Sequence, residues 1–241
     1  MANNPNNPLI IQGDKTVLVE VNNVLYEEVR DEVGRFAELE KSPEYMHTYR
    51  ITPLSLWNAA SSGMNAQDII FVLKKYSKFD LPQNVQQDIE DLVSRYGKLK
   101  LIREGEALYL FSEDRYLIHE IAHQKKVRPY IIGQKNERRL RVDPGMRGHI
   151  KHTLIKLGFP VEDLAGYTPG NPFALSLRKV TSKGRELHLR DYQSQAVEAF
   201  YAKGSDKGGS GVIVLPCGAG KTIAGMAIMQ KIQCETLVLT T

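Results

Sequence analysis

The sequence has 241 residues, which is enough for two or three domains, and its 42% hydrophobic and 25% charged residues are typical of a globular chain. Two cysteines, Cys217 and Cys234, exclude a disulfide framework and a four-ligand zinc site, and favour a reducing compartment. No apolar run is long enough to span a membrane, and the polar N-terminus lacks the apolar core of a signal peptide. We therefore expect a cytoplasmic protein that makes no use of a membrane.

The net charge of +4 decides little, but the charge is unevenly distributed. Nine acidic and four basic residues lie between Asp14 and Tyr45, whereas ten basic and two acidic residues lie between Gln124 and Lys156. Uneven charge on a solvated surface is the simpler interpretation, but any contact with a polyanion belongs to the basic stretch. Its candidate DNA-binding residues are Lys125, Lys126, Arg128, Arg138, Arg139, Arg141, Arg147 and Lys151.

The N-terminal stretch begins with residues 1–8, which are polar and predict a disordered tail. Strands are predicted over Leu9–Gln12 and Thr16–Val21. Apolar residues recur at helical spacing from Leu25 to Leu39, so we expect an amphipathic helix with an acidic outer face.

Three short helices are predicted next. Thr52 and Asn65 are the N-cap candidates of the first two, and the third begins near Pro82. Together with strand-like Leu99–Ile102 and Ala107–Phe111 they predict a winged-helix-like arrangement. The third helix is acidic, which does not suit a helix lying beside phosphates, so a structural or protein-binding role is favoured.

A literal H-E-x-x-H pattern lies on the following predicted helix, as His119-Glu120-Ile-Ala-His123. Two histidines at i and i+4 can bind zinc while the glutamate activates water. The longer metzincin pattern is not met, because Lys126 and Pro129 stand at its glycine and histidine positions. An ordinary amphipathic helix is the simpler interpretation, and a zinc-dependent hydrolase using His119 and His123 stays open as an alternative.

The basic stretch predicts a small αβ module. Strands are expected over Tyr130–Gly133 and Leu140–Val142, and a helix over Gly145–Leu157. A further strand over 171–178 and a linker over 180–186 follow.

A strand, a small-residue turn and a helix are predicted in succession near the C-terminus. Val212–Leu215 is typical of a buried parallel strand, and Lys221–Lys231 can form a helix. Backbone N–H groups of such a turn, together with the helix N-terminus, hold phosphates. Leu215 stands where the full P-loop pattern has glycine, so a turn that binds nothing remains the alternative. The predicted phosphate-binding residues are Pro216, Cys217, Gly218, Ala219, Gly220, Lys221 and Thr222, with Lys221 on the β/γ-phosphates and Thr222 on Mg²⁺.

A second motif, Leu189-Arg190-Asp-Tyr192-Gln193, opens a helix predicted over Asp191–Ala202. Together with SGVIVLPCGAGKT and the closing TLVLTT, it closely resembles the XPB branch of superfamily 2 helicases. The three segments correspond to the glutamine motif, motif I and the start of motif Ia. The resemblance covers essentially the whole chain and is strongest from Arg185 onward, and the N-terminal region resembles the bacterial form.

The resemblance implies ATP and Mg²⁺ as cofactors. Gln193 would read the adenine with support from Arg190, Lys221 and Thr222 would be the catalytic residues, and Thr240 and Thr241 would lie near the DNA backbone.

The resemblance also implies a function: an ATP-dependent 3′–5′ helicase or duplex translocase acting in nucleotide excision repair. It would act on duplex or forked DNA, with a nuclease or another repair protein as partner. The D-E-x-H motif and second RecA-like lobe of such helicases are not in the sequence, so we expect an N-terminal portion that is catalytically incomplete alone. A non-catalytic module that docks DNA or a partner protein is the alternative.

The expected fold class is a multi-domain α+β chain. An N-terminal helical, winged-helix-like domain (9–123) is followed by a small basic αβ domain that resembles a damage-recognition domain (124–180). The beginning of a first RecA-like α/β ATPase lobe (185–241) completes it.

Overall fold

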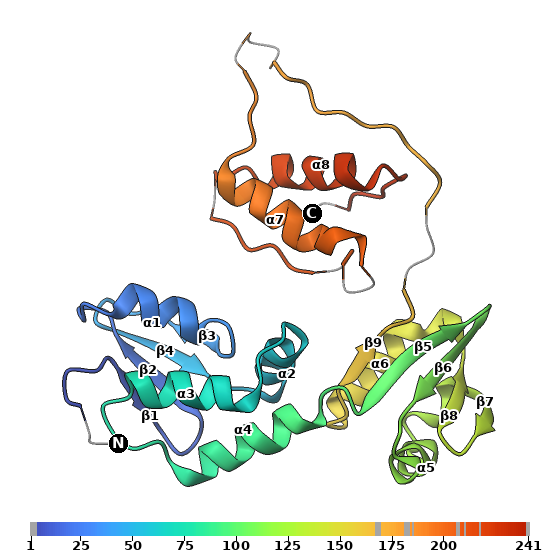
Figure 1. The fold of residues 1–241 in the computed structure, drawn as a ribbon, viewed down its shortest axis with the longest axis horizontal. Helices are drawn as coiled ribbons and strands as arrows, with labels where there is room; N and C mark the ends of the chain where they lie inside the picture. The colour runs from blue at the N-terminus through green and yellow to red at the C-terminus, as the bar shows by residue number, and fades with distance from the viewer. Residues whose placement is uncertain are drawn as a thin grey trace. The chain divides into compact units, whose positions relative to one another are not determined.

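The structure is a computed structural model, and it describes residues 4–166, 170–180, 184, 186–205, 208–209, 211–216 and 218–239. The chain divides into two compact units, Met1–Asp163 and Leu164–Thr241 (Figure 1). Helices and strands alternate along the first unit, whereas helices account for the regular structure described in the second. Within the described ranges, no helix combines the length and apolar character needed to cross a membrane.

The first unit begins with a four-stranded antiparallel sheet. Successive side chains of a strand point to opposite faces, so Leu9, Val17 and Val19 point inward and are fully buried, whereas Ile10 and Leu18 are only half-buried. The order across the sheet is β1 (Leu9–Ile11), β2 (Thr16–Glu20), β4 (Met46–Arg50) and β3 (Glu38–Lys41).

Four helices share one core with this sheet. Thr52 and Asn65 are N-caps, as predicted, each of them also forms a capping box, and Pro53 is the first residue of its helix. The indole of Trp57 is buried and donates to the Leu92 carbonyl at 2.9 Å. The helices are α1 (Tyr26–Val33), α2 (Pro53–Ser61), α3 (Ala66–Tyr76) and α4 (Gln83–Arg95).

Two expectations for the N-terminal stretch are wrong. Residues 4–8 of the predicted disordered tail are held to the fold at Asn7, which is buried and donates through Nδ2 to the carbonyls of Lys75 and Ser77 at 2.9 Å each. Residues 1–3 of the predicted tail lie outside the described residues. The predicted helix ends at Val33, and Leu39 instead lies on β3 with 52% of its surface exposed. The helical spacing of apolar residues continues beyond Val33 because Phe36, in the turn after α1, and Leu39, on β3, fall at the same intervals.

A second sheet of five strands follows, in which β9 runs parallel to β5 and all other pairs are antiparallel. One face of the sheet is apolar and buried, as are the inner sides of α5 (Arg115–His123) and α6 (Arg147–Lys156). Short 3-10 turns, η1 (Arg128–Tyr130) and η2 (Pro144–Met146), precede β7 and α6. The order across the sheet is β7 (Ile131–Asn136), β8 (Arg139–Val142), β6 (Ala107–Phe111), β5 (Leu99–Glu104) and β9 (Val161–Asp163).

This second sheet corrects the predicted division of the N-terminal half. β6 pairs with β8, placing Leu110 opposite Leu140, so a boundary between residues 123 and 124 would cut through one sheet. The β5–β6 hairpin belongs to this sheet and is no wing of the three preceding helices, so the winged-helix-like arrangement is wrong. The sequence pattern did not predict this pairing, because the partner strand of the hairpin lies about thirty residues further along the chain.

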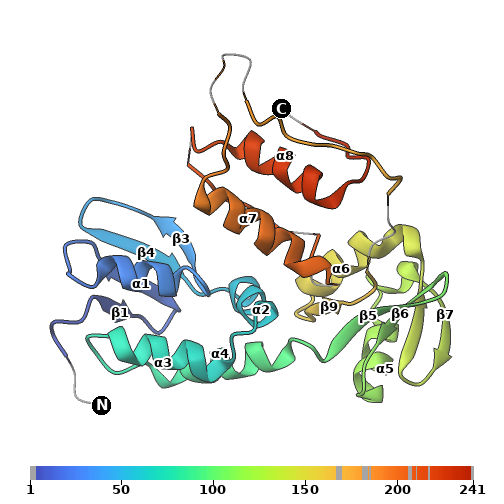
Figure 2. The ribbon, with the colours of Figure 1, turned by 45° about the horizontal axis from the view of Figure 1, so that its top comes forward.

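The second unit contains α7 (Asp191–Tyr201), a 3-10 turn η3 (Ala202–Gly204) and α8 (Lys221–Ile232). The helices α7 and α8 pack against each other, and Figure 2 shows them side by side. Both were predicted within one or two residues. The two predicted strands, over 171–178 and 212–215, are not formed in the part described: Pro172 makes only an isolated bridge to Cys234.

Candidate nucleotide and nucleic-acid sites

The turn before α8 has the backbone geometry that requires glycine. Gly218 and Gly220 both lie at a φ of +79°, in the left-handed region that side chains disfavour. A Cβ on Gly220 would lie 2.6 Å from Gln193 Nε2, whereas one on Gly218 would meet no atom within 4 Å. Gly220 is therefore needed for contact with α7, and Gly218 for the shape of the loop.

Two residues of the glutamine motif hold this loop. Gln193 is buried, accepts the Arg190 N–H through Oε1 at 3.0 Å and donates through Nε2 to the Ala219 carbonyl at 2.8 Å. The Tyr192 hydroxyl donates to the same carbonyl at 2.8 Å. Segments some 25 residues apart in the sequence are thus joined at Ala219, and both ends of the Gln193 amide are engaged.

The Lys221 ammonium is hydrogen-bonded to the segment that leads into the loop. It donates to the carbonyls of Leu215 at 2.8 Å and Pro216 at 3.2 Å. Thr222 follows in the first turn of α8 and is exposed. An exposed ammonium, a hydroxyl and a helix N-terminus are donors that fit a phosphate chain and its Mg²⁺, so these residues match the cofactors that the sequence predicts. The geometry can bind an anion, and it offers no base that would activate water.

The strand predicted before the loop is not there. Residues 211–216 form no strand, and Val212 and Val214 are 90% and 87% exposed. The expectation of a buried parallel strand is wrong for the described residues, because such a strand needs neighbours on both sides and helices on both faces. Three further predicted site residues, Cys217, Thr240 and Thr241, lie outside the described residues.

The predicted DNA-binding residues separate into paired and unpaired cations. Arg147 contacts Asp163 with two nitrogens, at 2.8 and 3.0 Å, and Lys151 contacts the same carboxylate at 2.8 Å. The Asp163 side chain is only 13% exposed, so these contacts fix α6 to β9. The cations of Arg147 and Lys151 are therefore largely neutralised within the fold.

The other predicted DNA-binding residues either form exposed ion pairs or form none among the described residues. Arg139 contacts Glu104 at 2.9 Å and Arg138 contacts Glu113 at 3.6 Å. Four exposed cations form no ion pair within the ranges that the structure describes, and they are Lys125, Lys126, Arg128 and Arg141. These four are the strongest candidates for a phosphate contact, because no carboxylate competes for them.

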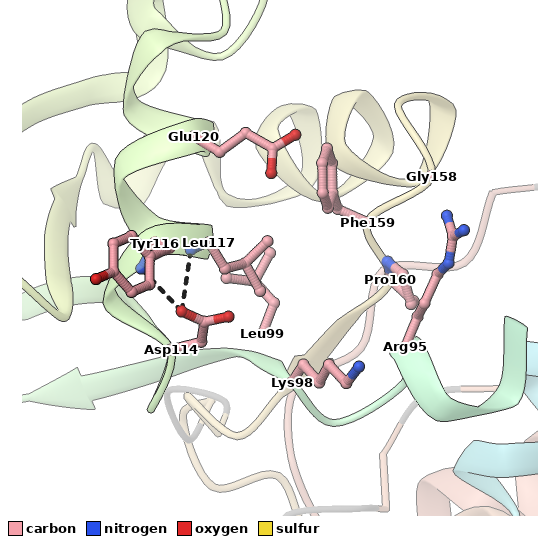
Figure 3. Close-up of a pocket in the computed structure, with 10 residues that line it drawn as sticks. All are labelled: Arg95, Lys98, Leu99, Asp114, Tyr116, Leu117, Glu120, Gly158, Phe159 and Pro160. Carbon is pink, nitrogen blue, oxygen red and sulfur yellow. Dashed lines mark hydrogen bonds between the residues drawn. The ribbon is translucent and has the colours of Figure 1, made fainter. Parts of the chain in front are cut away.

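The H-E-x-x-H pattern does not form a metal site. His119 and His123 are exposed on α5 with ring centroids 4.3 Å apart, and His123 Nδ1 lies 2.8 Å from the His119 carbonyl oxygen. Glu120 instead lines a pocket of about 280 Å³ that neither histidine lines, and Figure 3 shows its carboxylate pointing toward the ring of Phe159. Among the described residues, no group of three side chains could hold a metal ion. The zinc-hydrolase alternative is therefore dropped.

Two residues with structural roles in these sites were missed by sequence reasoning. Tyr192 bonds the loop carbonyl, and Asp163 binds two of the predicted DNA-binding cations. Tyr192 lies inside the quoted motif, so a hydroxyl next to the glutamine was a usable signal. Nothing in the sequence around Asp163 indicated that it would pair with α6.

Comparison with known proteins matches two regions of the chain to protein families. A family described as a helicase conserved C-terminal domain matches residues 9–135, just over half of the chain. A second, described as the res subunit of type III restriction enzymes, matches residues 186–240, which include the glutamine motif and the phosphate loop. The family matches therefore cover the two units separately.

Individual relatives match across almost the whole chain. A DNA 3′–5′ helicase XPB of Mycobacterium tuberculosis is 44% identical over 97% of the chain, and one of Kineococcus radiotolerans is 41% identical over 97%. A general transcription and DNA repair factor IIH helicase/translocase subunit XPB of Enterocytozoon bieneusi is 29% identical over 97%. The chain spans about 40% of the length of these relatives, since 41%, 40% and 38% of them are covered.

Proposed function

The chain belongs to the XPB family of DNA helicases, and on that basis we propose that it supplies one half of an ATP site and a DNA-contacting module to an ATP-dependent 3′–5′ helicase or duplex translocase. The proposed process is nucleotide excision repair on duplex or forked DNA. A cytoplasmic location and a nuclease or other repair protein as partner complete the proposal.

The contact between the glutamine motif and the phosphate loop is the observation that carries the ATP site. Gln193 and Tyr192 both donate to the Ala219 carbonyl, so the residues proposed to read adenine and those proposed to hold phosphates form one cluster. In this cluster Gln193 reads the adenine edge, Arg190 supports it, and bound ATP brings Mg²⁺ to Thr222. An adenine must compete with the internal partners of Gln193, which makes nucleotide binding weak in this chain.

ATP hydrolysis needs more than this cluster. Lys221 can stabilise charge on the phosphates, but the 241 residues contain no D-E-x-H carboxylate to activate water. The apolar segment before the loop is exposed and unpaired within the described residues, so the loop lacks the sheet that would fix it. We therefore propose that this chain alone turns over no ATP.

DNA contact is assigned to the second sheet and its flanking turns. The exposed cations without carboxylate partners in the described ranges, Lys125, Lys126, Arg128 and Arg141, supply the phosphate contacts. The alternative function, a docking module without catalysis, uses these same residues and is favoured by the unpaired segment before the phosphate loop.

Duplex-stimulated ATP hydrolysis by this chain tests the proposal, with Lys221→Ala as the matched variant. We expect no turnover in either protein while both retain DNA binding. Turnover that Lys221→Ala abolishes would contradict the account, since it would require a catalytic carboxylate that the motif comparison does not identify.

A further inference from the structure

The second sheet is covered on one face only. Leu108, Leu110 and Leu140 point to the covered face and are at most 1% exposed. Their neighbours in the strands point the other way and are only half-buried or exposed. Ile118 and Ile121 of α5, and Ile150 and Leu154 of α6, are fully buried, so these two helices belong to the covered face. The opposite face is therefore not covered by α5 or α6.

Two aromatic rings stand at the centre of this uncovered face. Tyr109 and Phe111 are two residues apart on β6, the middle strand of the five, so both project to the same side. The register places basic residues beside them on both neighbouring strands. Lys100 on β5 lies opposite Phe111, and Arg139 and Arg141 on β8 lie opposite Phe111 and Tyr109.

The cations contact the rings directly. The Arg139 guanidinium lies over the Phe111 ring, 5.4 Å from its centroid, and the Lys135 ammonium lies 5.2 Å from the centroid of Tyr109. We define the open face as these six residues, Lys100, Tyr109, Phe111, Lys135, Arg139 and Arg141. It combines stacking surfaces with flexible positive charge at adjacent positions.

A hollow extends the open face at one end. A pocket of about 550 Å³ is lined by Phe111 and Lys100 together with Tyr96 and Glu162. It shares Lys98 and Asp114 with the pocket of Figure 3, which is also lined by Phe159 and Arg95. The hollow also holds the carboxylates of Glu113, Asp114 and Glu162 beside Lys98 and Lys100, so it does not continue the positive charge of the open face. Phosphates are therefore expected at the open face itself and not in the hollow.

The charge balance of the open face stays positive after internal pairing. Glu104 contacts both Arg139 and Lys135, and Glu162 lies 3.8 Å from Lys100. Four cations thus face two carboxylates, and Arg141 makes no ion pair with any residue that the structure describes. Long basic side chains with exposed partners exchange partners readily, so phosphates can compete for them.

We propose that the open face binds single-stranded DNA, with unpaired bases stacked on Tyr109 and Phe111 and phosphates held by Lys100, Arg139 and Arg141. Rings on a sheet can stack only against bases that are not enclosed in a duplex, whereas a duplex presents its backbone. The inference rests on the proposed action on DNA and adds which strand form this surface holds. It assigns this sheet to an unwound strand of the DNA.

The test compares binding of two fluorescent probes, a roughly 12-nucleotide dT strand and a duplex of the same length, to the whole 241-residue chain. We expect Tyr109→Leu and Phe111→Leu each to weaken dT binding about tenfold, without changing the slope of log affinity against log salt. Arg141→Gln should instead reduce that slope. Duplex binding should change less than twofold in the two ring variants.

Phe71→Leu is the matched control, because Phe71 is 61% exposed on α3 and lies outside the open face. It should leave dT binding unchanged. Circular dichroism verifies that each variant is folded. For the unmodified protein, a dT strand carrying 5-iodouracil should cross-link under ultraviolet light to the peptide that contains Tyr109 and Phe111.

Failure of this inference can be distinguished from failure of the proposed function. Duplex binding without dT binding, or dT binding that neither ring variant weakens, would overturn the inference and leave the proposed action on duplex DNA intact. Cross-links confined to peptides outside the second sheet would overturn it as well. Binding of neither probe would remove both proposals.

Discussion

Apolar segments are buried in a sheet in the first unit but exposed in the second. In the first, Leu108 and Leu110 on β6 are 1% and 0% exposed, because strands on both sides and helices on one face enclose them. In the second, Val212 and Val214 lie in the continuous apolar run Val212–Leu215 and are 90% and 87% exposed. The difference shows that an apolar, β-branched stretch predicts a capacity to form a strand, and that partner strands decide whether it does.

The largest effect is expected when one apolar side chain in each unit is shortened to alanine and the losses of stability are compared. Leu110→Ala removes a fully buried side chain from the central strand and should lower the free energy of unfolding by about 3 kcal/mol. Val212→Ala should change it by less than about 0.5 kcal/mol, because its side chain is already exposed. Urea unfolding followed by circular dichroism measures both. Equal losses would mean that Val212 is enclosed in solution.

A smaller effect is expected at the junction of α7 and the phosphate loop. Gln193→Leu removes both hydrogen bonds of a buried amide, so amides in the first turn of α8 should exchange hydrogen about tenfold faster. Tyr192→Phe removes one bond to the same carbonyl and should have a weaker effect.

The control for this junction is Glu198→Gln, which breaks an exposed ion pair with Lys231 at 2.7 Å. It leaves the loop contacts in place, so exchange at Ala224 should not change. If exchange were faster in Glu198→Gln, or were not accelerated in Gln193→Leu, the glutamine would not anchor the loop.

The smallest effect concerns the pH dependence of the first unit. The Tyr76 hydroxyl and the Lys75 ammonium hydrogen-bond to Glu28 and hold the pKa of that carboxyl below its ordinary value. A lowered folded-state pKa gives stability that is complete above about pH 4.3 and is lost as the pH falls through the folded-state value. Tyr76→Phe should therefore destabilise at pH 7 and do so progressively less in acid.

Denaturant titrations of this variant at several pH values, beside Tyr45→Phe, provide the measurement. Tyr45 is 65% exposed and should show no such dependence. A loss that is constant with pH would show that Tyr76 contributes through packing and not through Glu28.

The sequence allowed most individual elements to be predicted, because their signals are local. Thr52 and Asn65 cap the predicted helices, and the helices on either side of the phosphate loop begin where the motifs place them. The wrong predictions listed next concern contacts between segments that are distant in the sequence. Pairing of β6 with β8, docking of Asn7 and the absence of a strand at Val212 depend on residues far along the chain.

The candidate sites follow the same rule. The spacing of Gly218, Gly220 and Lys221 predicted a phosphate loop, whereas Gln193 was assigned through the resemblance to helicases. The neutralisation of Arg147 and Lys151 by Asp163 could not be predicted, because a count of charges along the sequence does not show which cations form ion pairs. Only the fold separates cations that hold the protein together from those available to a ligand.

Salt-dependent binding of duplex DNA tests the central claim most directly: that the first unit carries DNA contact independently of the phosphate loop. Lys221→Ala should bind as the unmodified chain does. Joint replacement of Lys125, Lys126 and Arg128 by glutamine should weaken binding about tenfold or more and lower the salt slope by roughly two to three. Loss of binding in Lys221→Ala, or full binding in the triple variant, would contradict this division of roles.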